Sequence, residues 1–320
     1  MNDLAPLLAA RGFPCSRIDP LAGDASSRRY ARVALADGGS AILVFYPAEI
    51  RSAAGRFLHS TELLATAGVP VPRVLACDPD HAWMLVEDLG ERTLAERRDL
   101  GPAELAASFA QAAELARRIA RLPAAAVAAL NPPLDGALLR RELEQTRDAL
   151  LAPRGLLGDA ATSAGVSALF DEICALLGAE PAVPCHRDFM ARNLIPREAR
   201  GGPDGAELAV IDHQDLRLGP PHYDLASLLN DTLFPPPGVE QEIVTAAAPT
   251  AAERESYHRT AAQRTFKAAG SFAKLAERGV ARHLPLIPET LARGLAHLGE
   301  TREGAVWAPR LAELWRPALP

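Results

Sequence analysis

The chain has 320 residues, of which 48% are hydrophobic and 23% charged. This composition is typical of a globular protein that buries a sizeable core, and it excludes disordered and coiled-coil classes. The length exceeds what one core usually supports, so we expect two packed lobes. With 34 basic and 40 acidic residues the net charge is −6. That balance gives no global field for a phosphate backbone and argues against nucleic-acid binding.

The cysteines and the amino-terminal segment indicate the compartment. Four cysteines occur without C-x-x-C spacing, which argues against a zinc site and a disulfide framework and favours a reducing cytoplasm. The first residues lack a basic lead-in, and the longest run of small apolar residues, 124–130, is too short to cross a bilayer. We therefore expect a cytoplasmic protein without a membrane partner, and the sequence leaves its oligomeric state open.

The first 90 residues show strand and turn patterns around one helix. Residues 30–35 and 40–46 are alternating or β-branched and flank a turn at 37–39, which predicts a β-hairpin. Residues 51–67 carry apolar side chains at helical spacing and are followed by Gly68, which predicts a helix. Two further strands are predicted at 73–77 and 82–87.

The remainder is rich in Ala, Leu and Arg and is predicted to be mainly helical, with helices at 102–121, 136–151 and 163–177 and again from His222 onward. Short apolar segments around 194–195 and 208–211 interrupt the helices and predict a β-hairpin on the helical lobe. The predicted fold class is α+β and two-lobed. A small antiparallel-sheet N-lobe with one helix takes residues 1–88, and a larger helical C-lobe takes residues 89–320.

The segment 186–193 carries the chemistry, because it has the form H-R-D-x-x-x-x-N and is followed by Asp212 at the end of an apolar strand. Phosphoryl transfer needs magnesium to neutralise phosphates and a group that orients the attacking hydroxyl. Asp188 would accept the hydroxyl proton, while Asn193 and Asp212 would hold Mg²⁺ through hard oxygen atoms. Such a motif is expected by chance on the order of 10⁻³ times in a chain of this composition. The alternative is that these residues cap turns and end a strand.

Longer runs around this motif carry a family resemblance. The sequence resembles the aminoglycoside phosphotransferase and choline kinase group, relatives of protein kinases with a two-lobed fold, and a closer likeness within that group is carried by residues 23–30, 85–90, 211–215 and 218–225. The resemblance extends from about residue 21 to about residue 229. Within the group it is greatest to the bacterial cell-wall amino-sugar kinases, which phosphorylate the anomeric hydroxyl of N-acetylmuramate and N-acetylglucosamine. It implies ATP as the nucleotide.

The resemblance also implies nucleotide-binding positions. The G-D-A-S run is the loop over the phosphates in that family, which implies contacts by Ser26 and Ser27, with Arg28 and Arg29 adjacent. The alternative for this run is an ordinary turn capped by Asp24. The E-D-L-G run is in that family the inter-lobe hinge whose backbone meets adenine, which implies that role for Glu87 and Asp88. The alternative is that these two residues are the solvated end of a strand.

One departure from the kinase pattern is the missing lysine of the third strand. The chain has only two lysines, Lys267 and Lys274. The usual helix partner of that lysine would be Glu62, which would then pair with Arg28, Arg29 or Arg32, because a guanidinium suits both carboxylate and phosphate. The alternative for Glu62 is an exposed helix residue. A missing lysine also fits a pseudokinase without turnover, although Asp188, Asn193 and Asp212 are all retained.

Supporting roles are predicted for neighbours of the motif. We expect His186 to be a buried support, Arg187 to brace the loop or bind the acceptor, and Asp224 to cap a helix at 223–232 or brace the catalytic loop. The side chains of 213–215 would face the floor of the cleft. Asp215 would be an auxiliary polar residue near the metal or would cap a loop.

The charge of the last helices bears on the acceptor. Residues 252–320 carry 11 basic and 7 acidic residues, a local balance of +4, which disfavours a polycationic aminoglycoside. A small neutral or carboxylated sugar such as N-acetylmuramate fits better. Five residues could stack on a sugar or belong to the core: Tyr257, His258, Phe266, Phe272 and Trp307.

The leading interpretation is an ATP- and Mg²⁺-dependent sugar kinase of cell-wall recycling. The alternatives are an aminoglycoside or choline-type kinase and a nucleotide-binding pseudokinase.

Overall fold

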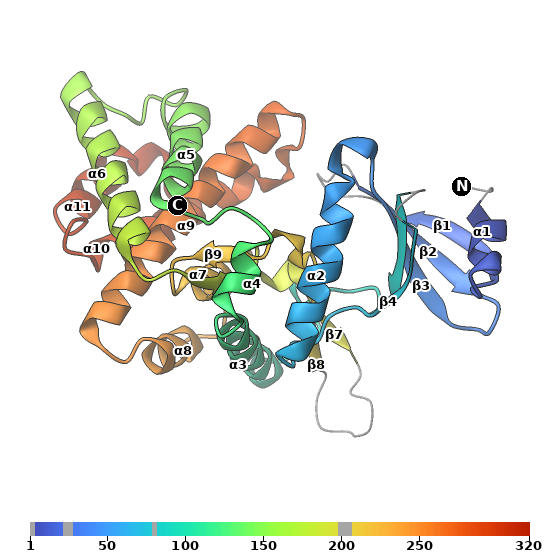
Figure 1. Ribbon diagram of the computed structural model, residues 1–320. Helices are drawn as coiled ribbons and strands as arrows, with labels where there is room; N and C mark the ends of the chain where they lie inside the picture. Colours follow the sequence, from blue (N-terminus) through green and yellow to red (C-terminus); the bar gives the residue numbers. More distant parts are fainter. Residues whose placement is uncertain (1–3, 22–27, 79–81, 198–206) are drawn as a thin grey trace. The chain divides into compact units, whose positions relative to one another are not determined.

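The computed structural model describes residues 4–21, 28–78, 82–197 and 207–320, and these form two compact units (Figure 1). Unit 1 consists of Met1–Glu96 and Arg192–Asp215, and unit 2 consists of Arg97–Ala191 and Leu216–Pro320. The sequence had suggested one boundary after residue 88, with the hairpin beyond residue 193 on the helical lobe. By packing, this hairpin groups with the N-terminal residues, because Val210 N donates a hydrogen bond to Pro70 O at 2.8 Å.

Unit 1 is built on a five-stranded antiparallel sheet with the strand order β1-β2-β3-β5-β4. Both predicted hairpins and the predicted helix are present, with bounds close to those expected. The elements of this part are α1 (Leu4–Ala10), β1 (Cys15–Leu21), β2 (Arg29–Leu35), β3 (Ser40–Phe45), α2 (Ser52–Thr66), β4 (Val74–Asp78) and β5 (Trp83–Glu87).

Both faces of this sheet are covered, which explains the nearly continuous apolar run of β3. Leu43 points to the face covered by Leu8 of α1, where Trp83 is 2% exposed. The next residue, Val44, points to the opposite face and packs with Phe57 of α2. Alternate residues of a strand point to opposite faces, so a strand buried on both sides needs apolar residues at successive positions.

A second hairpin completes unit 1. Strands β7 (Leu194–Arg197) and β8 (Glu207–Val210) pair antiparallel with Leu194 opposite Val210. This hairpin confirms the two short strands predicted from the apolar segments.

Unit 2 contains nine helices and one short ribbon within its described residues. The predicted helices are confirmed, and α5 continues into a π-helical turn over Arg147–Leu151. The elements are α3 (Pro102–Ile119), α4 (Ala124–Ala128), α5 (Gly136–Thr146), α6 (Ala160–Ala179), β6 (Val183–Cys185), β9 (Arg217–Gly219), α7 (Tyr223–Leu229), α8 (Val239–Ala247), α9 (Ala251–Glu277), α10 (Ile287–Gly299) and α11 (Trp307–Leu314).

Side-chain caps fix where several of these helices begin. Asp135 accepts from Leu138 N at the start of α5, and Asp159 accepts from Thr162 N at the start of α6. At α9, Thr250 and Glu253 form a reciprocal capping box. Such caps satisfy N–H groups that have no partner within the helix.

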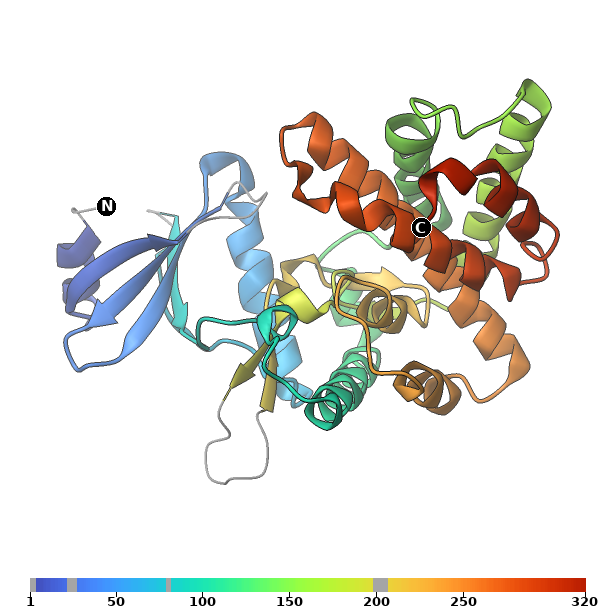
Figure 2. The same ribbon diagram turned by 180° about the vertical axis from the view of Figure 1, so that it is seen from behind.

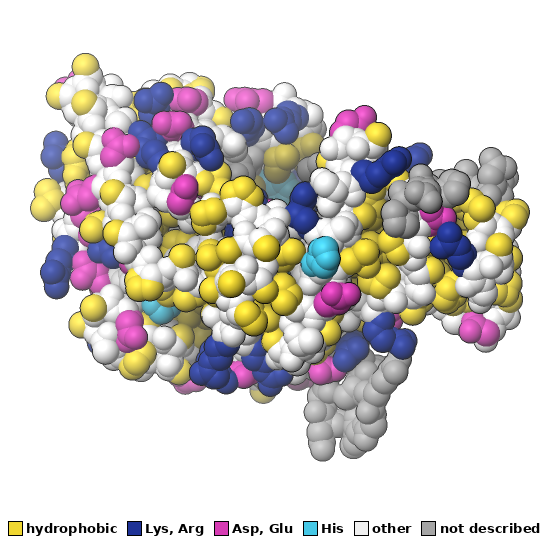
Figure 3. All heavy atoms as spheres, in the orientation of Figure 1, with side chains coloured by type: hydrophobic (Ala, Val, Ile, Leu, Met, Phe, Trp, Pro, Cys, Tyr) yellow, Lys and Arg dark blue, Asp and Glu magenta, His cyan; other side chains and the backbone are white. Residues whose placement is uncertain are grey.

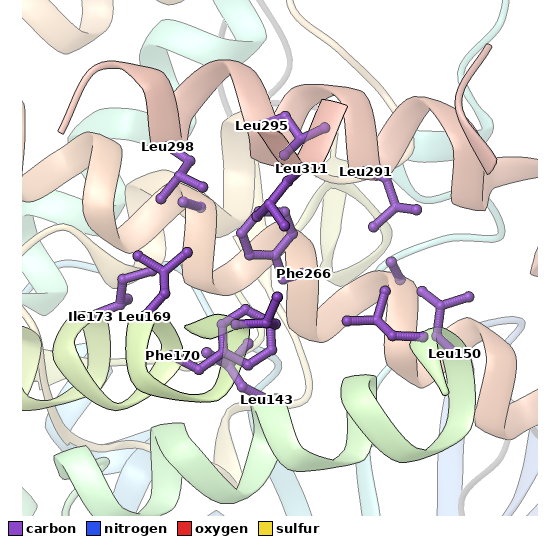
Figure 4. Packing of buried hydrophobic residues seen from close by; sticks show 14 of the residues in the cluster. Leu143, Leu150, Leu169, Phe170, Ile173, Phe266, Leu291, Leu295, Leu298 and Leu311 are labelled. Atoms are coloured by element: carbon purple, nitrogen blue, oxygen red, sulfur yellow. The ribbon is translucent and has the colours of Figure 1, made fainter. Parts of the chain in front are cut away.

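The core of unit 2 surrounds α9, which packs against α5, α6, α7 and α10 (Figure 2). Figure 4 shows Phe266 of α9 among leucines of α5, α10 and α11 and beside Phe170 of α6. Near the carboxyl end of the chain, Trp315 is fully buried against Phe266 and donates from Nε1 to Leu156 O at 2.9 Å. The long helix α9 is therefore the central support of this unit.

Helix α6 is the one helix of the described ranges that is long and apolar enough to span a membrane, a feature that the sequence interpretation did not identify. Its residues Leu169, Phe170 and Ile173 are buried in the core around α9. Helix α6 therefore packs as a core helix of unit 2.

On the face seen in Figure 3, basic and acidic side chains are interspersed over the helical unit.

Candidate active site

The backbone of residues 186 and 187 is held by one buried carboxylate in unit 2. Asp224, in the first turn of α7, accepts from His186 N at 2.6 Å and from Arg187 N at 2.9 Å. Arg187 adopts a left-handed conformation with φ of 76°, which a non-glycine residue rarely takes without support. Asp224 therefore braces the loop, one of the two roles expected for it, while His222 occupies the N-cap position.

The two residues before Asp188 support it. His186 is fully buried, with its ring edge against Phe189 at a centroid distance of 5.9 Å, the position expected of a supporting residue. Arg187 Nη2 donates to Glu142 Oε1 of α5 at 3.0 Å. Of the roles considered for Arg187, the structure shows the brace.

Asp188 lies in a positive environment. Burial by itself raises the pKa of Asp188, but the charges of Lys267, Arg264 and Arg187 outweigh burial and lower the pKa to about 2. Arg264 Nη2 is 3.7 Å from Asp188 Oδ1. Asp188 is therefore a carboxylate at neutral pH and can accept a hydrogen bond from a hydroxyl group.

In unit 1, the β7–β8 hairpin brings two oxygen-bearing residues to the same end. Ile211 N donates to Asn193 O at 3.0 Å, so the residue before Asp212 lies opposite Asn193. Asn193 is 8% exposed, and Asp212 has a left-handed backbone with φ of 63°. The sequence predicted that pairing of the two strands would place residues 193 and 212 together, and this pairing is present.

Arg28, the residue before β2, contacts this end of the hairpin. Its Nη2 donates to Asp212 Oδ1 at 2.6 Å and its Nη1 donates to Gln214 Oε1 at 3.0 Å, while Gln214 Nε2 donates to the same Asp212 oxygen at 3.0 Å. The guanidinium also lies over the Tyr30 ring. Arg28 is therefore bound to a carboxylate that the sequence assigned to the metal.

Asn193 and Asp212 carry the kind of donor atom, oxygen, that a magnesium ion binds. Mg²⁺ binds oxygen ligands and usually takes one or two from the protein, the others being water and phosphate oxygens. An amide and a carboxylate at one hairpin end meet that requirement. Within the described ranges no cluster of three or more His, Cys, Asp or Glu side chains forms an all-protein metal site.

His213 differs from the expectation. The sequence placed its side chain toward the floor of a cleft, but the ring is fully buried and stacks on Phe57 of α2 at 4.4 Å. Its Nδ1 lies 2.8 Å from Ser60 Oγ and its Nε2 lies 3.4 Å from Thr61 Oγ1. An aromatic ring with two polar atoms can occupy this pocket only where hydroxyl groups satisfy it. His213 thus ties the turn 213–215 to α2, and Asp215 ends that turn half-buried.

The segment after β5 is held by Arg32 of β2. Arg32 Nε and Nη2 donate to the two oxygens of Asp88 at 2.6 and 3.1 Å, and Nη1 donates to Glu91 Oε1 at 2.8 Å. Glu87 accepts from Arg73 Nε at 3.1 Å. The side chains of both predicted hinge residues are therefore engaged by arginines, and the adenine contact assigned to their backbone stays a prediction.

The pairing suggested for Glu62 is not found among the described residues. Glu62 is exposed on α2, the alternative that the sequence left open. Arg28 binds Asp212, Arg32 binds Asp88, and Arg29 lies over the Phe45 ring. Ser26 and Ser27 lie outside the described residues.

Most of the aromatic residues considered for sugar stacking belong to the core. Tyr257 and Phe266 are fully buried, and Phe272 is 7% exposed. Trp307 packs on Gly165 of α6, and His258 Nδ1 lies 3.0 Å from His297 Nδ1. Tyr257, Phe266 and Phe272 are therefore core residues and are not available to stack on a sugar.

The sequence interpretation did not identify three residues near Asp188: Glu142, Arg264 and Lys267. Glu142 accepts from Arg187, while Arg264 and Lys267 are the largest sources of positive potential at Asp188. They lie 46 to 79 positions from Asp188, so local pattern could not connect them. One sequence feature could have indicated them: Lys267, one of only two lysines, lies three residues after Arg264 in a segment predicted to be helical.

Comparison with known sequences gives a family and close relatives. The sequence pattern of the phosphotransferase enzyme family matches residues 17–263. The chain is 32% identical to an N-acetylmuramate/N-acetylglucosamine kinase of Pseudomonas putida, in an alignment that covers 98% of this chain and 93% of the relative. It is 30% identical to the kinase of the same name from Neisseria meningitidis, over 84% of this chain and 82% of the relative.

Solved structures of the same fold are similar to this chain. A choline/ethanolamine kinase family protein from Mesorhizobium loti gives a TM-score of 0.61 at 19% identity, covering 96% of this chain and 95% of that one. Aminoglycoside 2′-phosphotransferase-IIIa, solved with GDP, gives 0.63 at 12% identity, covering 95% and 98%. The predicted two-lobed α+β fold and the predicted resemblance are both confirmed.

Proposed function

The chain belongs to the phosphotransferase enzyme family, and from this membership we propose that it transfers the γ-phosphoryl group of ATP to the anomeric hydroxyl of N-acetylmuramate or N-acetylglucosamine. The reaction would serve cell-wall recycling in the cytoplasm. The observation that carries the proposal is the ionised Asp188 beside the loop backbone that Asp224 braces. Support for the acceptor comes from relatives at 30 to 32% identity that bear the name of this amino-sugar kinase.

In the proposed reaction, Asp188 accepts a hydrogen bond from the acceptor hydroxyl and takes its proton as the oxygen is phosphorylated. Because the pKa of Asp188 is about 2, this carboxylate orients the hydroxyl more than it draws away its proton in the ground state. Positioning of this kind is the main contribution that a protein makes to phosphoryl transfer.

We assign the metal and nucleotide to unit 1 residues. Asn193 and Asp212 would hold Mg²⁺, and Arg28 would exchange Asp212 for a phosphate oxygen, since a guanidinium suits either anion. When bound, ATP would supply the phosphoryl group and leave as ADP, and magnesium would neutralise the charge of the phosphates. We further propose Ser26, Ser27 and Arg29 at the phosphates, the backbone of Glu87 and Asp88 at the hinge, and Asp215 near the metal.

The chemistry of the acceptor favours a sugar over a polycation. The surplus positive charge of residues 252–320 repels an aminoglycoside and tolerates a neutral or carboxylated sugar. Within unit 2, cations rather than carboxylates predominate around Asp188.

A coupled ADP-release assay with a panel of acceptors tests the proposal. The panel contains N-acetylmuramate, N-acetylglucosamine, an aminoglycoside and choline, each with ATP and with or without Mg²⁺. We expect turnover with the amino sugars alone, and only with the metal. Product analysis should place the phosphate on the anomeric oxygen. Turnover with choline or an aminoglycoside alone, or nucleotide binding without turnover, contradicts the proposal.

A further inference from the structure

Helix α9 presents two cations on one face toward the catalytic loop. Arg264 and Lys267 are three residues apart, so their side chains lie on the same side of the helix. Arg264 is 6% exposed, donates from Nε to Ser227 Oγ at 2.9 Å, and lies 3.7 Å from Asp188 Oδ1. This contact fixes its guanidinium beside the carboxylate that we assign to the acceptor hydroxyl.

The close approach of α9 to α5 depends on a glycine of α9, Gly270. A Cβ atom added at Gly270 would lie 2.5 Å from Thr146 Cα and 2.3 Å from Thr146 Oγ1. Thr146 Oγ1 also donates to Phe266 O at 2.9 Å. This close approach brings the turn that carries Lys267 next to the turn of α5 that carries Glu142, whose pKa is lowered by the charge of Lys267 against the opposing effect of burial.

The charged side chains of this region have different partners. Three cations, Arg187, Arg264 and Lys267, act on the carboxylates of Asp188 and Glu142, and Asp231 also acts on Arg264. Glu142 is already occupied, because it accepts from Arg187 at 3.0 Å and from Gln263 Nε2 at 3.4 Å. The described hydrogen bonds of the Glu142 carboxylate thus come from Arg187 and Gln263 and not from Lys267.

Lys267 is the cation without a bound acceptor. Among the described residues its ammonium makes no hydrogen bond or ion pair, although it is half-buried and electrostatically coupled to Asp188 and Glu142. Burial and the charge of Arg264 lower the pKa of Lys267, and the charges of Glu142 and Asp188 offset this lowering only in part. The chain's other lysine, Lys274, donates to Gln145 Oε1 at 3.3 Å. A half-buried ammonium has three donors to satisfy, and an anionic oxygen satisfies them best.

We propose that Lys267, with Arg264 beside it, binds anionic oxygens of the substrates at Asp188. The inference rests on the proposed function and deepens it. Such oxygens have two sources in that reaction: the phosphoryl group under transfer and the lactyl carboxylate that N-acetylmuramate has and N-acetylglucosamine lacks. The competing view is that Lys267 only neutralises Asp188 and Glu142 and touches no substrate.

A direct test uses the scarcity of lysine. Reductive ¹³C-dimethylation retains the positive charge and labels only Lys267, Lys274 and the α-amine, so the spectrum contains three signals, which Lys274→Arg assigns. The protein is titrated with Mg²⁺ and a non-hydrolysable ATP analogue, with N-acetylmuramate, and with N-acetylglucosamine. We expect the Lys267 signal to shift with the nucleotide analogue or with the carboxylated sugar, while the Lys274 signal stays constant. A Lys267 signal that responds to none of them overturns the proposal.

Kinetics of Lys267→Gln separate the two sources. If Lys267 binds the phosphoryl group, kcat falls about 10- to 100-fold with both sugars, the range typical of one charge-assisted hydrogen bond. If it binds the carboxylate, KM rises by a similar factor for N-acetylmuramate alone. Lys267→Arg should restore part of the loss in either case. Lys274→Gln is the matched control on the same helix and should leave both parameters unchanged.

Failure of this inference can be distinguished from failure of the proposed function. If the unaltered protein phosphorylates no amino sugar, the function is wrong, and the shift of Lys267 with the nucleotide analogue still tests anion binding. If the amino sugars are phosphorylated but Lys267→Gln retains normal kcat and KM, the inference is wrong and the function stands. A loss of thermal stability in Lys267→Gln with unchanged kinetics also overturns it, because that outcome is the purely neutralising role.

Discussion

Asp224 is a single residue on which the catalytic loop depends. Its two oxygens accept the N–H groups of His186 and Arg187, and Arg187 holds a backbone conformation that such bonds must stabilise. Burial raises the pKa of Asp224 to about 6, although the charge of His186 and the two backbone bonds oppose the increase. The residue that orients the loop therefore titrates close to physiological pH.

This pKa predicts a pH dependence of stability. Because the folded pKa lies above the usual value of 3.8, the folded state binds the proton more tightly than the unfolded state. The resulting stabilisation is complete below about pH 4 and lost as the pH rises through about 6, and it amounts to up to about 3 kcal/mol. In Asp224→Asn this part of the decline should disappear, as measured by urea unfolding between pH 4 and 7.5. If the unfolding free energies of the variant and the parent differ by the same amount at every pH in this range, the raised pKa of Asp224 is wrong.

Asp188 should behave differently from Asp224. Asp188→Asn retains the shape of the side chain but cannot accept a proton, so we expect kcat to fall by about 10² to 10⁴. Nucleotide affinity, measured by calorimetry, should change little. Because the pKa of Asp188 is about 2, its ionisation should produce no acid limb in kcat/KM above about pH 4. A variant with more than a tenth of the parent kcat would show that Asp188 is not the acceptor of the proton.

At the scale of elements, His213 links the turn after β8 to α2. Its ring stacks on Phe57 and its Nδ1 lies against Ser60 Oγ, all fully or nearly buried. Ser60→Ala should lower the unfolding free energy by about 1–3 kcal/mol, because a buried ring nitrogen loses its partner. Thr66→Ala, at the exposed end of the same helix, is the control and should change it by less than about 0.5 kcal/mol. Equal effects in urea unfolding would refute the link.

The crossing of α5 and α9 makes a second prediction. Gly270→Ala forces a methyl group into Thr146 and should destabilise the protein by about 1–3 kcal/mol, while also displacing Lys267. Gly55→Ala is the matched control, because Gly55 lies in α2 with no atom within 4 Å of an added Cβ. It should stabilise by about 0.5–1 kcal/mol, since alanine is the better helix former. Thermal unfolding of both variants would show opposite signs.

The elements that the sequence predicted are those with a strong local pattern. Strands β2, β3, β4 and β5 and helix α2 follow from alternation, turn residues and helical spacing. Strand β1 was missed because Cys15–Leu21 contains Pro20 and two charged residues and is half-exposed. The β6–β9 ribbon was missed because each strand has three residues. Helix α7 ends at Leu229, before the predicted residue 232, and the side chain of the next residue, Asn230, donates to Ala226 O.

For the whole molecule, the limit of sequence reasoning is distance along the chain. The motif residues and their brace were predicted because they carry a spacing pattern. The surroundings of Asp188 were not, since Lys267 acts on it from α9, and Glu142 of α5 is linked to it through Arg187. The inward orientation of His213 depends likewise on hydroxyl groups of α2, more than 150 residues earlier.

Each unit contains its own enclosed indole. Trp83 lies in the sheet core of unit 1, and Trp315 lies against Phe266 in unit 2. Both should emit fluorescence at short wavelength when the protein is folded, whereas half-exposed Trp307 should emit nearer to the solvent value. In Trp83→Phe, all tryptophan fluorescence would come from unit 2. In Trp315→Phe, a larger fraction of the fluorescence would come from Trp83 of unit 1. The protein thus contains natural probes that reveal whether its two parts melt in one step or in two.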